Sequence, residues 1–404
     1  MSKLLGCLIL LVLPFIGSTQ TENYWTKKSD FTGLKRERGV GFSIGDFGYV
    51  GTGVDTAEIV HNDLWKYDPL LDTWTQMANL PGSVRRNAVG FAINDMGYIG
   101  TGIDSTEAQV PGAIVLNDFW QYNPITNSWL QKADFPGMGN TGLYFATGFS
   151  VDAKGYICGG KNGPNSYSKE LWEYKPVTDQ WARLDDFPGG LRYQLSSFTI
   201  GYKAYVGLGT DQDLYNNDFW EFDITTNSWS QIQDLPSSER SAAMTFTIGQ
   251  RGFVCMGNNG GLLLDLWEYN PYDDEWTPRA DYEGSARKGG VAFTINGKSY
   301  VGIGKGYSGK KASFYEYTPA SVLSIEELVV DFNIYPNPSS EVISIRTASS
   351  KITHFEILNF SGNRIKEIYS KDKIDISNLT SGNYILVAFD DQNKILSQQK
   401  FIKI

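Results

Sequence analysis

Five arginines recur at one position of an internal repeat and carry the clearest candidate chemistry in the sequence. Each lies thirteen residues before an aromatic residue near the end of an apolar strand, and Leu143 takes the equivalent place in the third repeat. Guanidinium groups converging around a ring suit a carboxylate or another anionic group, which they bind through forked hydrogen bonds. The predicted ligand-binding ring, at one mouth of a central channel, consists of Arg36, Arg85, Arg192, Arg240 and Arg287.

A structural role for the same arginines is the alternative. Aspartates recur five residues after one of the repeated tryptophans, and Asn79 takes the sixth place. Pairs between this column and the arginines would join neighbouring repeats, as repeated charges in repeat proteins commonly do. The aspartates are Asp30, Asp134, Asp186, Asp234 and Asp281. The sequence leaves both interpretations open.

A second candidate surface comes from three loops that differ between repeats, at 54–61, 103–115 and 161–168. Loops on a rigid scaffold are where recognition is usually found. The polar residues of these loops that we expect to contact a ligand are Asp55, His61, Asp104, Glu107, Lys161 and Asn162.

Catalytic and metal-binding residues are not predicted. The only histidines are His61 and His354, on separate predicted domains. A copper or zinc site needs several converging nitrogen or sulfur ligands, and a Ser-His-Asp set needs a histidine beside its partners. We therefore expect no metal, no cofactor and no catalytic residue. Cys158 and Cys255 occupy the same column of non-adjacent repeats, which predicts two buried free thiols and no disulfide.

The repeat itself is defined by tryptophan pairs nine residues apart, beginning with Trp65/Trp74 and Trp120/Trp129. A period of 47 to 55 residues indicates a propeller or solenoid. Each unit contains four predicted strands, and the tryptophans are expected to pack between units. The sixth unit lacks its last strand, and 24–31 matches that strand, so an N-terminal strand closing a six-bladed ring is predicted. A polar column before each third strand, which includes Asp63 and Asp118, is interpreted as holding a turn.

The repeated motifs resemble those of the kelch family. They include Tyr49-Val-Gly-Thr-Gly53 and Tyr205-Val-Gly-Leu-Gly209 together with the paired Trp and Tyr residues, and the resemblance covers 24–319. It implies a β-propeller and leaves function open, because kelch domains include binding modules, sugar-acid isomerases and copper oxidases.

After Pro319 the repeat stops, and a linker is predicted at 320–332. Seven short strands with intervening turns predict a small antiparallel β-sandwich at 333–404. Tyr335-Pro-Asn-Pro338 and the ending Lys400-Phe-Ile-Lys-Ile404 resemble the C-terminal sorting domain of type IX secretion. That resemblance implies export, with the secretion machinery as a partner, and a secreted or outer-membrane surface-attached product.

Composition supports an exported protein. Residues 1–19 have a positive start, an apolar core and small residues after it, which indicates a signal peptide. No later segment is apolar for long enough to span a bilayer, so no transmembrane segment is expected in the mature chain. The net charge is −10 and no basic face is evident, which argues against a nucleic-acid partner.

The sequence therefore predicts an all-β protein, with a six-bladed kelch-type propeller at 24–319 and a β-sandwich at 333–404. Its expected function is non-catalytic binding of a protein or glycan outside the cell. The alternative is a sugar-acid isomerase resembling kelch-type sialate mutarotases, in which the arginine ring would hold the carboxylate. No proton donor and acceptor for that reaction can be assigned.

Overall fold

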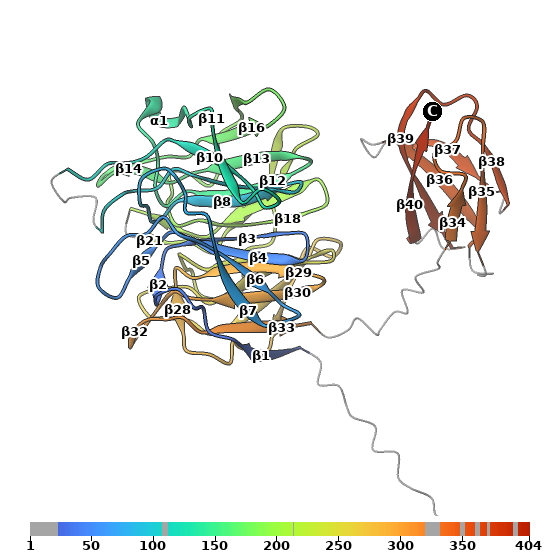
Figure 1. Cartoon of the computed structure of the whole chain (residues 1–404). Helices are drawn as coiled ribbons and strands as arrows, with labels where there is room; N and C mark the ends of the chain where they lie inside the picture. Colours follow the sequence, from blue (N-terminus) through green and yellow to red (C-terminus); the bar gives the residue numbers. More distant parts are fainter. Residues whose placement is uncertain are drawn as a thin grey trace, which may run out of the picture.

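The structure, a computed structural model, describes residues 23–106, 112–212, 214–319, 332–347, 352–359, 364–369, 372–390 and 395–404. The predicted signal peptide, Glu107 and all of the predicted linker except Phe332 lie outside these ranges. Among the described residues the regular structure is β, apart from the four-residue helix α1 (Gly137–Asn140) (Figure 1). The all-β prediction is confirmed. In the same ranges no helix has the length and apolar character needed to cross a bilayer.

Six four-stranded antiparallel sheets lie within 23–319. In the first, β3 (Val40–Ile44), β4 (Phe47–Gly51), β6 (Leu64–Asp68) and β7 (Thr73–Met77) pair in that order. The next four sheets have the same order. The second contains β8 (Val89–Ile93), β9 (Met96–Gly100), β10 (Phe119–Asn123) and β11 (Ser128–Lys132), and the third contains β12 (Thr147–Val151), β13 (Lys154–Cys158), β16 (Leu171–Lys175) and β17 (Gln180–Arg183). The fourth contains β18 (Ser196–Ile200), β19 (Lys203–Gly207), β22 (Phe219–Asp223) and β23 (Ser228–Gln231), and the fifth contains β24 (Met244–Ile248), β25 (Arg251–Cys255), β26 (Leu266–Asn270) and β27 (Glu275–Arg279).

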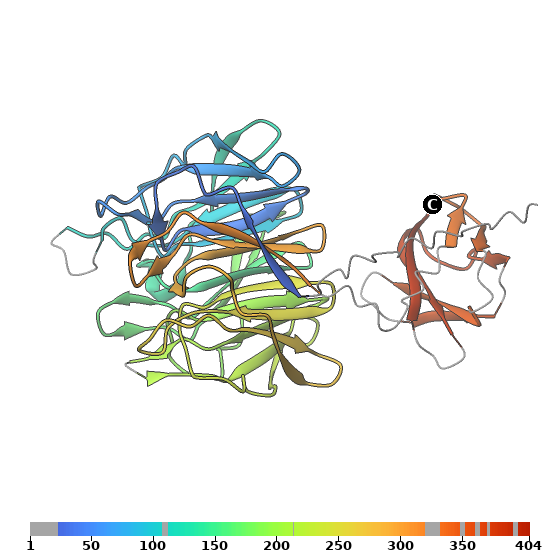
Figure 2. The same cartoon turned by 90° about the horizontal axis from the view of Figure 1, so that it is seen from below.

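The remaining sheet joins the two ends of the repeat region. It contains β29 (Val291–Ile295), β30 (Lys298–Gly302) and β33 (Phe314–Thr318), and its outer strand is β1 (Tyr24–Lys28). In both views, β1 in dark blue lies against the orange strands of this sheet (Figures 1 and 2). Trp25 of β1 is 3% exposed, and its ring lies 5.0 Å from both Tyr282 and Tyr317. The N-terminal strand thus contributes both hydrogen bonds and an aromatic side chain to the last sheet.

The innermost strands of the six sheets contact one another in a cycle. Each of β3, β8, β12, β18 and β24 contacts the next, and β29 contacts β3. Glycine permits the close approach: a Cβ on Gly41 would lie 2.7 Å from Val291, and one on Gly90 would lie 2.6 Å from Val40. These strands surround a cavity of about 250 Å³. It is lined by residues 39–41, 88–90, 146–148, 195–197, 243–245 and 290–292.

The repeated tryptophans pack between neighbouring sheets, as the repeat pattern predicts. The indole Nε1 of Trp129 donates to the carbonyl of Ala78 in the preceding sheet at 2.9 Å, and that of Trp181 donates to Ala133 at the same distance. Aromatic rings also meet across the boundary between sheets: the ring centroids of Tyr49 on β4 and Tyr122 on β10 lie 5.8 Å apart. Burial of aromatic area of this kind stabilises the contact between sheets.

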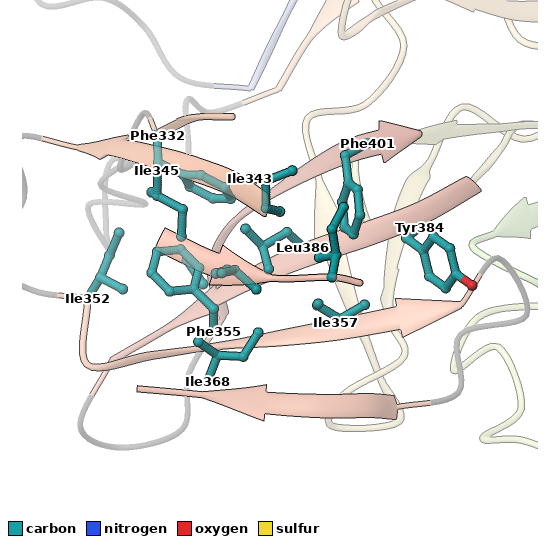
Figure 3. Packing of buried hydrophobic residues seen from close by; sticks show 13 residues of the cluster. Phe332, Ile343, Ile345, Ile352, Phe355, Ile357, Ile368, Tyr384, Leu386 and Phe401 are labelled. Atoms are coloured by element: carbon teal, nitrogen blue, oxygen red, sulfur yellow. The ribbon is translucent and has the colours of Figure 1, made fainter. Parts of the chain in front are cut away.

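The C-terminal region forms two sheets around one core. One sheet pairs β34 (Phe332–Tyr335), β35 (Val342–Thr347) and β38 (Lys373–Asp375). The other has the order β37 (Arg364–Ile368), β36 (His354–Asn359), β39 (Gly382–Phe389) and β40 (Ile395–Lys403). Phe332 and Ile345 from the first sheet pack with Phe355, Leu386 and Phe401 from the second (Figure 3). Seven strands in two layers with a shared core fit the predicted sandwich.

The two terminal motifs of this region contact each other. The side-chain amide of Asn337 donates to the carbonyl of Lys400 at 3.0 Å and accepts from the backbone N–H of Ile402 at 2.9 Å. The backbone N–H of Ser339 donates to Ile402 at 2.9 Å, and that of Ile404 donates to Ser339 at 3.0 Å. The Asn-Pro segment therefore holds the last strand of the chain in place.

Candidate functional site

The repeated arginines are buried and bonded to acidic residues of their own repeat. Arg85, at 0% exposure, donates from Nη1 to Asp118 Oδ1 at 2.8 Å and from Nη2 to Oδ2 at 2.7 Å. Its Nη1 also donates to the carbonyl of Thr101 at 3.1 Å, and its Nε donates to that of Ser83 at 3.1 Å. The same bidentate pairs form between Arg36 and Asp63, between Arg192 and Asp218, and between Arg240 and Asp265.

This arrangement corrects the predicted ligand ring of Arg36, Arg85, Arg192, Arg240 and Arg287. The guanidinium groups lie among backbone carbonyls and carboxylates of the fold, with residue exposures between 0% and 6%, and do not open onto the channel mouth. The structural alternative is right in kind, but it names the wrong partners. Asp30 instead lies 3.5 Å from Lys27, and Asp186 accepts from Arg183 at 2.8 Å. The partners come from the polar column that was interpreted as holding a turn.

Electrostatics and the two exceptions support this pairing. Burial by itself would raise the pKa of the Asp118 and Asp265 carboxyls, but the hydrogen bonds and charge of the arginines more than offset it and lower the pKa. Where Leu143 replaces the arginine, Glu170 stands in the acidic column and accepts from the indole of Trp172 at 2.9 Å. Where Ser313 replaces the acid, its hydroxyl accepts from Arg287 Nη2 at 2.9 Å. The arginine column is therefore part of the scaffold.

Two residues beyond each arginine position, a second column forms a closed ring of backbone hydrogen bonds, which we call the girdle. Each N–H donates to the carbonyl of the preceding member at 2.7 to 3.1 Å, and the N–H of Arg38 donates to Gly289 to complete the ring. All six backbones are left-handed, with φ between 51° and 62°. The girdle consists of Arg38, Asn87, Phe145, Gln194, Ala242 and Gly289.

The girdle lies at one end of the central cavity, because each of its residues immediately precedes a cavity-lining segment. Its backbone geometry repeats six times, whereas its side chains differ at every position. The column one residue earlier also varies, with tyrosine in two of its six places, and contains Glu37, Arg86, Tyr144, Tyr193, Ser241 and Lys288. A rigid ring with non-repeating side chains at a channel mouth has the properties expected of a recognition surface.

Positive charge concentrates at this mouth. The cationic cluster, as we define it, consists of Arg38, Arg86, Lys161, Lys288 and Lys305. The acid in contact with the cluster is Glu37, whose Oε2 lies 3.4 Å from Arg38 Nε and whose Oε1 lies 4.0 Å from Lys305 Nζ, and the charge of Glu58 also acts on Arg86. Burial, together with repulsion from Arg38, lowers the pKa of Arg86 to about 10. The same two causes lower the pKa of Lys161 and that of Lys288.

Aromatic rings flank the cationic cluster on one side. The ammonium of Lys161 lies 4.4 Å from the ring centre of Tyr193, 5.5 Å from Tyr144 and 5.7 Å from Tyr167. From the first repeat, the guanidinium of Arg38 reaches the ring of Phe145 in the third repeat at 4.6 Å. Cation–π contacts of this kind hold long basic side chains in place. The mouth thus has an aromatic side in the third and fourth repeats, and small residues, including Ala242 and Gly289, on the other side.

The predicted loop residues are distributed unevenly around this mouth. Lys161 belongs to the cationic cluster, whereas Asn162 donates to the hydroxyl of Thr141 at 2.7 Å. Asp55 is buried and accepts from His61 Nε2 at 2.9 Å. Asp104 accepts from the backbone N–H of Ile114 at 2.7 Å and so holds its own loop. The predictions for Asp55, His61, Asp104 and Asn162 as ligand contacts remain untested, and Glu107 lies outside the described residues.

The sequence did not identify the girdle or the column before it. The available signal was variation at a fixed repeat position: the girdle residues differ in every unit, and the preceding column repeats only its tyrosine, while the flanking arginines and glycines recur. The cysteine prediction fits the structure: Cys158 and Cys255 are buried free thiols, and burial raises the pKa of both.

Comparison with known proteins supports both parts of the chain. Residues 145–304 match the KLHDC2/KLHL20/DRC7 kelch-repeats domain, and residues 333–404 match the secretion system C-terminal sorting domain. A solved structure titled "Structure of YjhT" is 20% identical, with a TM-score of 0.58, and the match covers 71% of this chain and 94% of that one. At this identity the similarity concerns the fold alone. The curated proteins contain no match to the chain.

The repeat geometry, the two-sheet C-terminal region and these matches agree. The chain combines a kelch-repeat domain with a C-terminal sorting domain of the type IX secretion system, and so belongs among proteins exported to the cell surface or beyond.

Proposed function

We propose that residues 24–319 form a six-bladed propeller, closed by β1, that binds a protein or glycan outside the cell at the girdle face. The signal peptide at 1–19 would direct export, 320–332 would link the two domains, and 333–404 would engage the secretion machinery. Two cyclic sets of hydrogen bonds support the blade count and the closure. One is the girdle, and in the other the N–H of Gly304 in the last repeat donates to the carbonyl of Arg36 in the first at 2.8 Å.

The observation that carries the binding role is the contrast within the girdle. Six backbone segments have one conformation and one hydrogen-bond pattern, yet they present Arg, Asn, Phe, Gln, Ala and Gly side chains. Repeated scaffold positions in this chain retain their residue type, as the arginines and tryptophans do. The backbone makes the ring of hydrogen bonds, so closure does not demand one residue type at these positions and their side chains can vary with the ligand.

The isomerase alternative loses its basis in this arrangement. It required the arginine column to hold a sugar carboxylate, and internal carboxylates occupy four of those arginines. Binding without catalysis is therefore the function that the geometry favours. An NMR assay of sialic acid with the purified protein provides a direct check, since accelerated exchange of its anomers would require an enzyme.

The binding role is tested with a glycan array and with pulldown from the native surroundings, using the exported protein. Phe145→Ala and Gln194→Ala alter the girdle face. Ile125→Ser is the matched control, because Ile125 is 87% exposed on the turn between β10 and β11. Loss of the captured ligand in both girdle variants and retention in the control would support the proposal. Equal capture by all three would place the ligand elsewhere.

A further inference from the structure

The cationic cluster at the channel mouth points to the chemistry of the ligand. We infer that the mouth binds an oxyanion, a carboxylate, phosphate or sulfate group, through Arg38, Arg86 and Lys288. This inference rests on the proposed function and narrows it, because it specifies which ligands the girdle face accepts. Four observations carry it, and none of them involves the repeated arginine column.

The first observation is an imbalance of charge. Five cations surround the mouth, and Glu37 is the acid in contact with them, while Glu58 is near enough for its charge to act on Arg86, although the whole chain carries a net charge of −10. Elsewhere in the repeats, cations have carboxylate partners: Lys203 Nζ lies 2.6 Å from Glu221 Oε1, and Lys154 Nζ lies 3.0 Å from Glu173 Oε2. Like charges held together without counter-charges repel one another, so a bound anion would lower the energy of the folded protein.

The second observation concerns donors that the fold leaves unused. Within the described ranges, the ammonium of Lys288 makes neither a hydrogen bond nor an ion pair. Asn87 is only 7% exposed, and its side-chain Nδ2 also has no hydrogen-bond partner among the described residues. A buried amide donor without a partner carries a desolvation cost that an acceptor from a ligand would remove.

The third observation is that these donors are positioned together. Asn87 Oδ1 accepts from Arg38 Nη1 at 3.1 Å, which orients the amide against the guanidinium and leaves Nδ2 without a partner. Arg38 is in turn held by Glu37 and by the face of Phe145. A guanidinium and an amide N–H on one rigid ring provide the convergent donors that an oxyanion needs.

The fourth observation is the influence of Arg38 on its neighbours. Its charge contributes to lowering the pKa of Arg86, Lys161 and Lys288, which reach it from the second, third and sixth repeats. Cations from three repeats therefore lie near Arg38, and Lys161 Nζ and the Arg38 guanidinium both approach the ring of Phe145, at 5.9 Å and 4.6 Å. Gly289 lies close to this point, because a Cβ added to it would lie 3.4 Å from Arg38 Cγ and 3.8 Å from Glu37 Oε2.

Calorimetric titration of the exported protein with inorganic phosphate at low ionic strength tests the inference. Lys288→Gln and Arg38→Gln should each weaken phosphate binding about tenfold, the change expected when a charged hydrogen bond is lost. Glu37→Gln should strengthen binding, because it removes the competing internal anion without changing the side-chain shape. Lys203→Gln, which removes a cation from the hairpin between β18 and β19, is the matched control and should change binding less than twofold.

The opposite signs keep the test decisive even if one variant folds poorly. Equal phosphate affinity in Lys288→Gln, Glu37→Gln and the control would overturn the inference, as would the absence of phosphate binding. Parallel titrations with glucuronate and with a sulfated monosaccharide, at equal ionic strength, separate a carboxylate from a sulfate ligand. A glycan or protein captured through Phe145 and Gln194 but unaffected by Lys288→Gln would preserve the proposed function while rejecting its oxyanion chemistry.

Discussion

The backbone N–H of Arg38 donates a 2.7 Å hydrogen bond to the carbonyl of Gly289, which joins the first repeat directly to the sixth. The N–H of Phe31 donates to Ala312 at 2.8 Å across the same junction. Contacts between the ends of the repeat region are therefore made by the backbone at the girdle and by β1 at the periphery. A strand left unpaired at this junction would expose open backbone groups and promote association with other chains.

Trp25→Ala should destabilise the repeat domain by about 3–5 kcal/mol, because it removes a buried indole between two sheets. The indole of Trp25 also donates to the carbonyl of Ala280 at 3.0 Å, which would lose its partner. Urea unfolding of the wild-type and variant proteins measures the difference. Thr26→Ala, on the exposed face of the same strand, is the control and should change stability by less than about 0.5 kcal/mol. A Trp25 variant as stable as this control would show that β1 contributes little to the last sheet.

Asp118→Asn should lower the free energy of unfolding by about 3 kcal/mol, since it leaves the buried Arg85 guanidinium without a counter-charge. The matched control is Asp134→Asn, an exposed position in the aspartate column that was first expected to pair with the arginines. Urea unfolding at neutral pH compares the two variants. A larger loss in the Asp134 variant would contradict the pairing seen in the structure.

The repeat, the all-β class and the cysteine environment follow from residue spacing, because a period in sequence becomes a set of equivalent places in space. Spacing alone does not indicate which two columns meet. Asp134 lies closer in sequence to the arginine position of the following repeat, occupied by Leu143, than Asp118 lies to Arg85. Asp118 is nevertheless the residue that bonds Arg85. The reason is geometric: in an antiparallel sheet the starts of the first and third strands and the end of the fourth lie at the same end, so both acidic columns lie at the arginine end and spacing cannot choose between them.

The girdle escaped prediction for a different reason. Its backbone is left-handed at Phe145, Gln194 and Ala242, residue types that seldom adopt this conformation and give no turn signal. Tertiary hydrogen bonds from neighbouring repeats impose that conformation. The cationic cluster is likewise assembled from separate repeats, and no local run of basic residues reveals it.

Stability should fall in acid through the arginine-bound aspartates. The pKa of the Asp265 carboxyl is lowered in the folded protein, so the unfolded chain takes up protons at a higher pH than the folded chain does. The stabilisation is present above the unfolded value of about 3.9 and is lost as the pH falls through the folded pKa. Urea midpoints from pH 7 to pH 3 should therefore decline less steeply for Asp265→Asn than for wild type. Asp281→Asn, at an exposed site in the same repeat, should retain the wild-type slope.

Asn337→Ala should reduce export, because the Asn337 side chain bonds both Lys400 and Ile402 and so holds the final strand against the Asn-Pro segment. Without these bonds the end of β40 would be held to 337–339 only by the backbone hydrogen bonds of Ser339, which would loosen the surface formed jointly by the two motifs. The measurement is the fraction of protein outside the cells, relative to the total, for chains with and without the change. Asn333→Ala, at an exposed position on β34, is the control and should be exported as wild type. Deletion of 333–404 sets the lower limit, and export that survives this deletion would rule out recognition through the C-terminal domain.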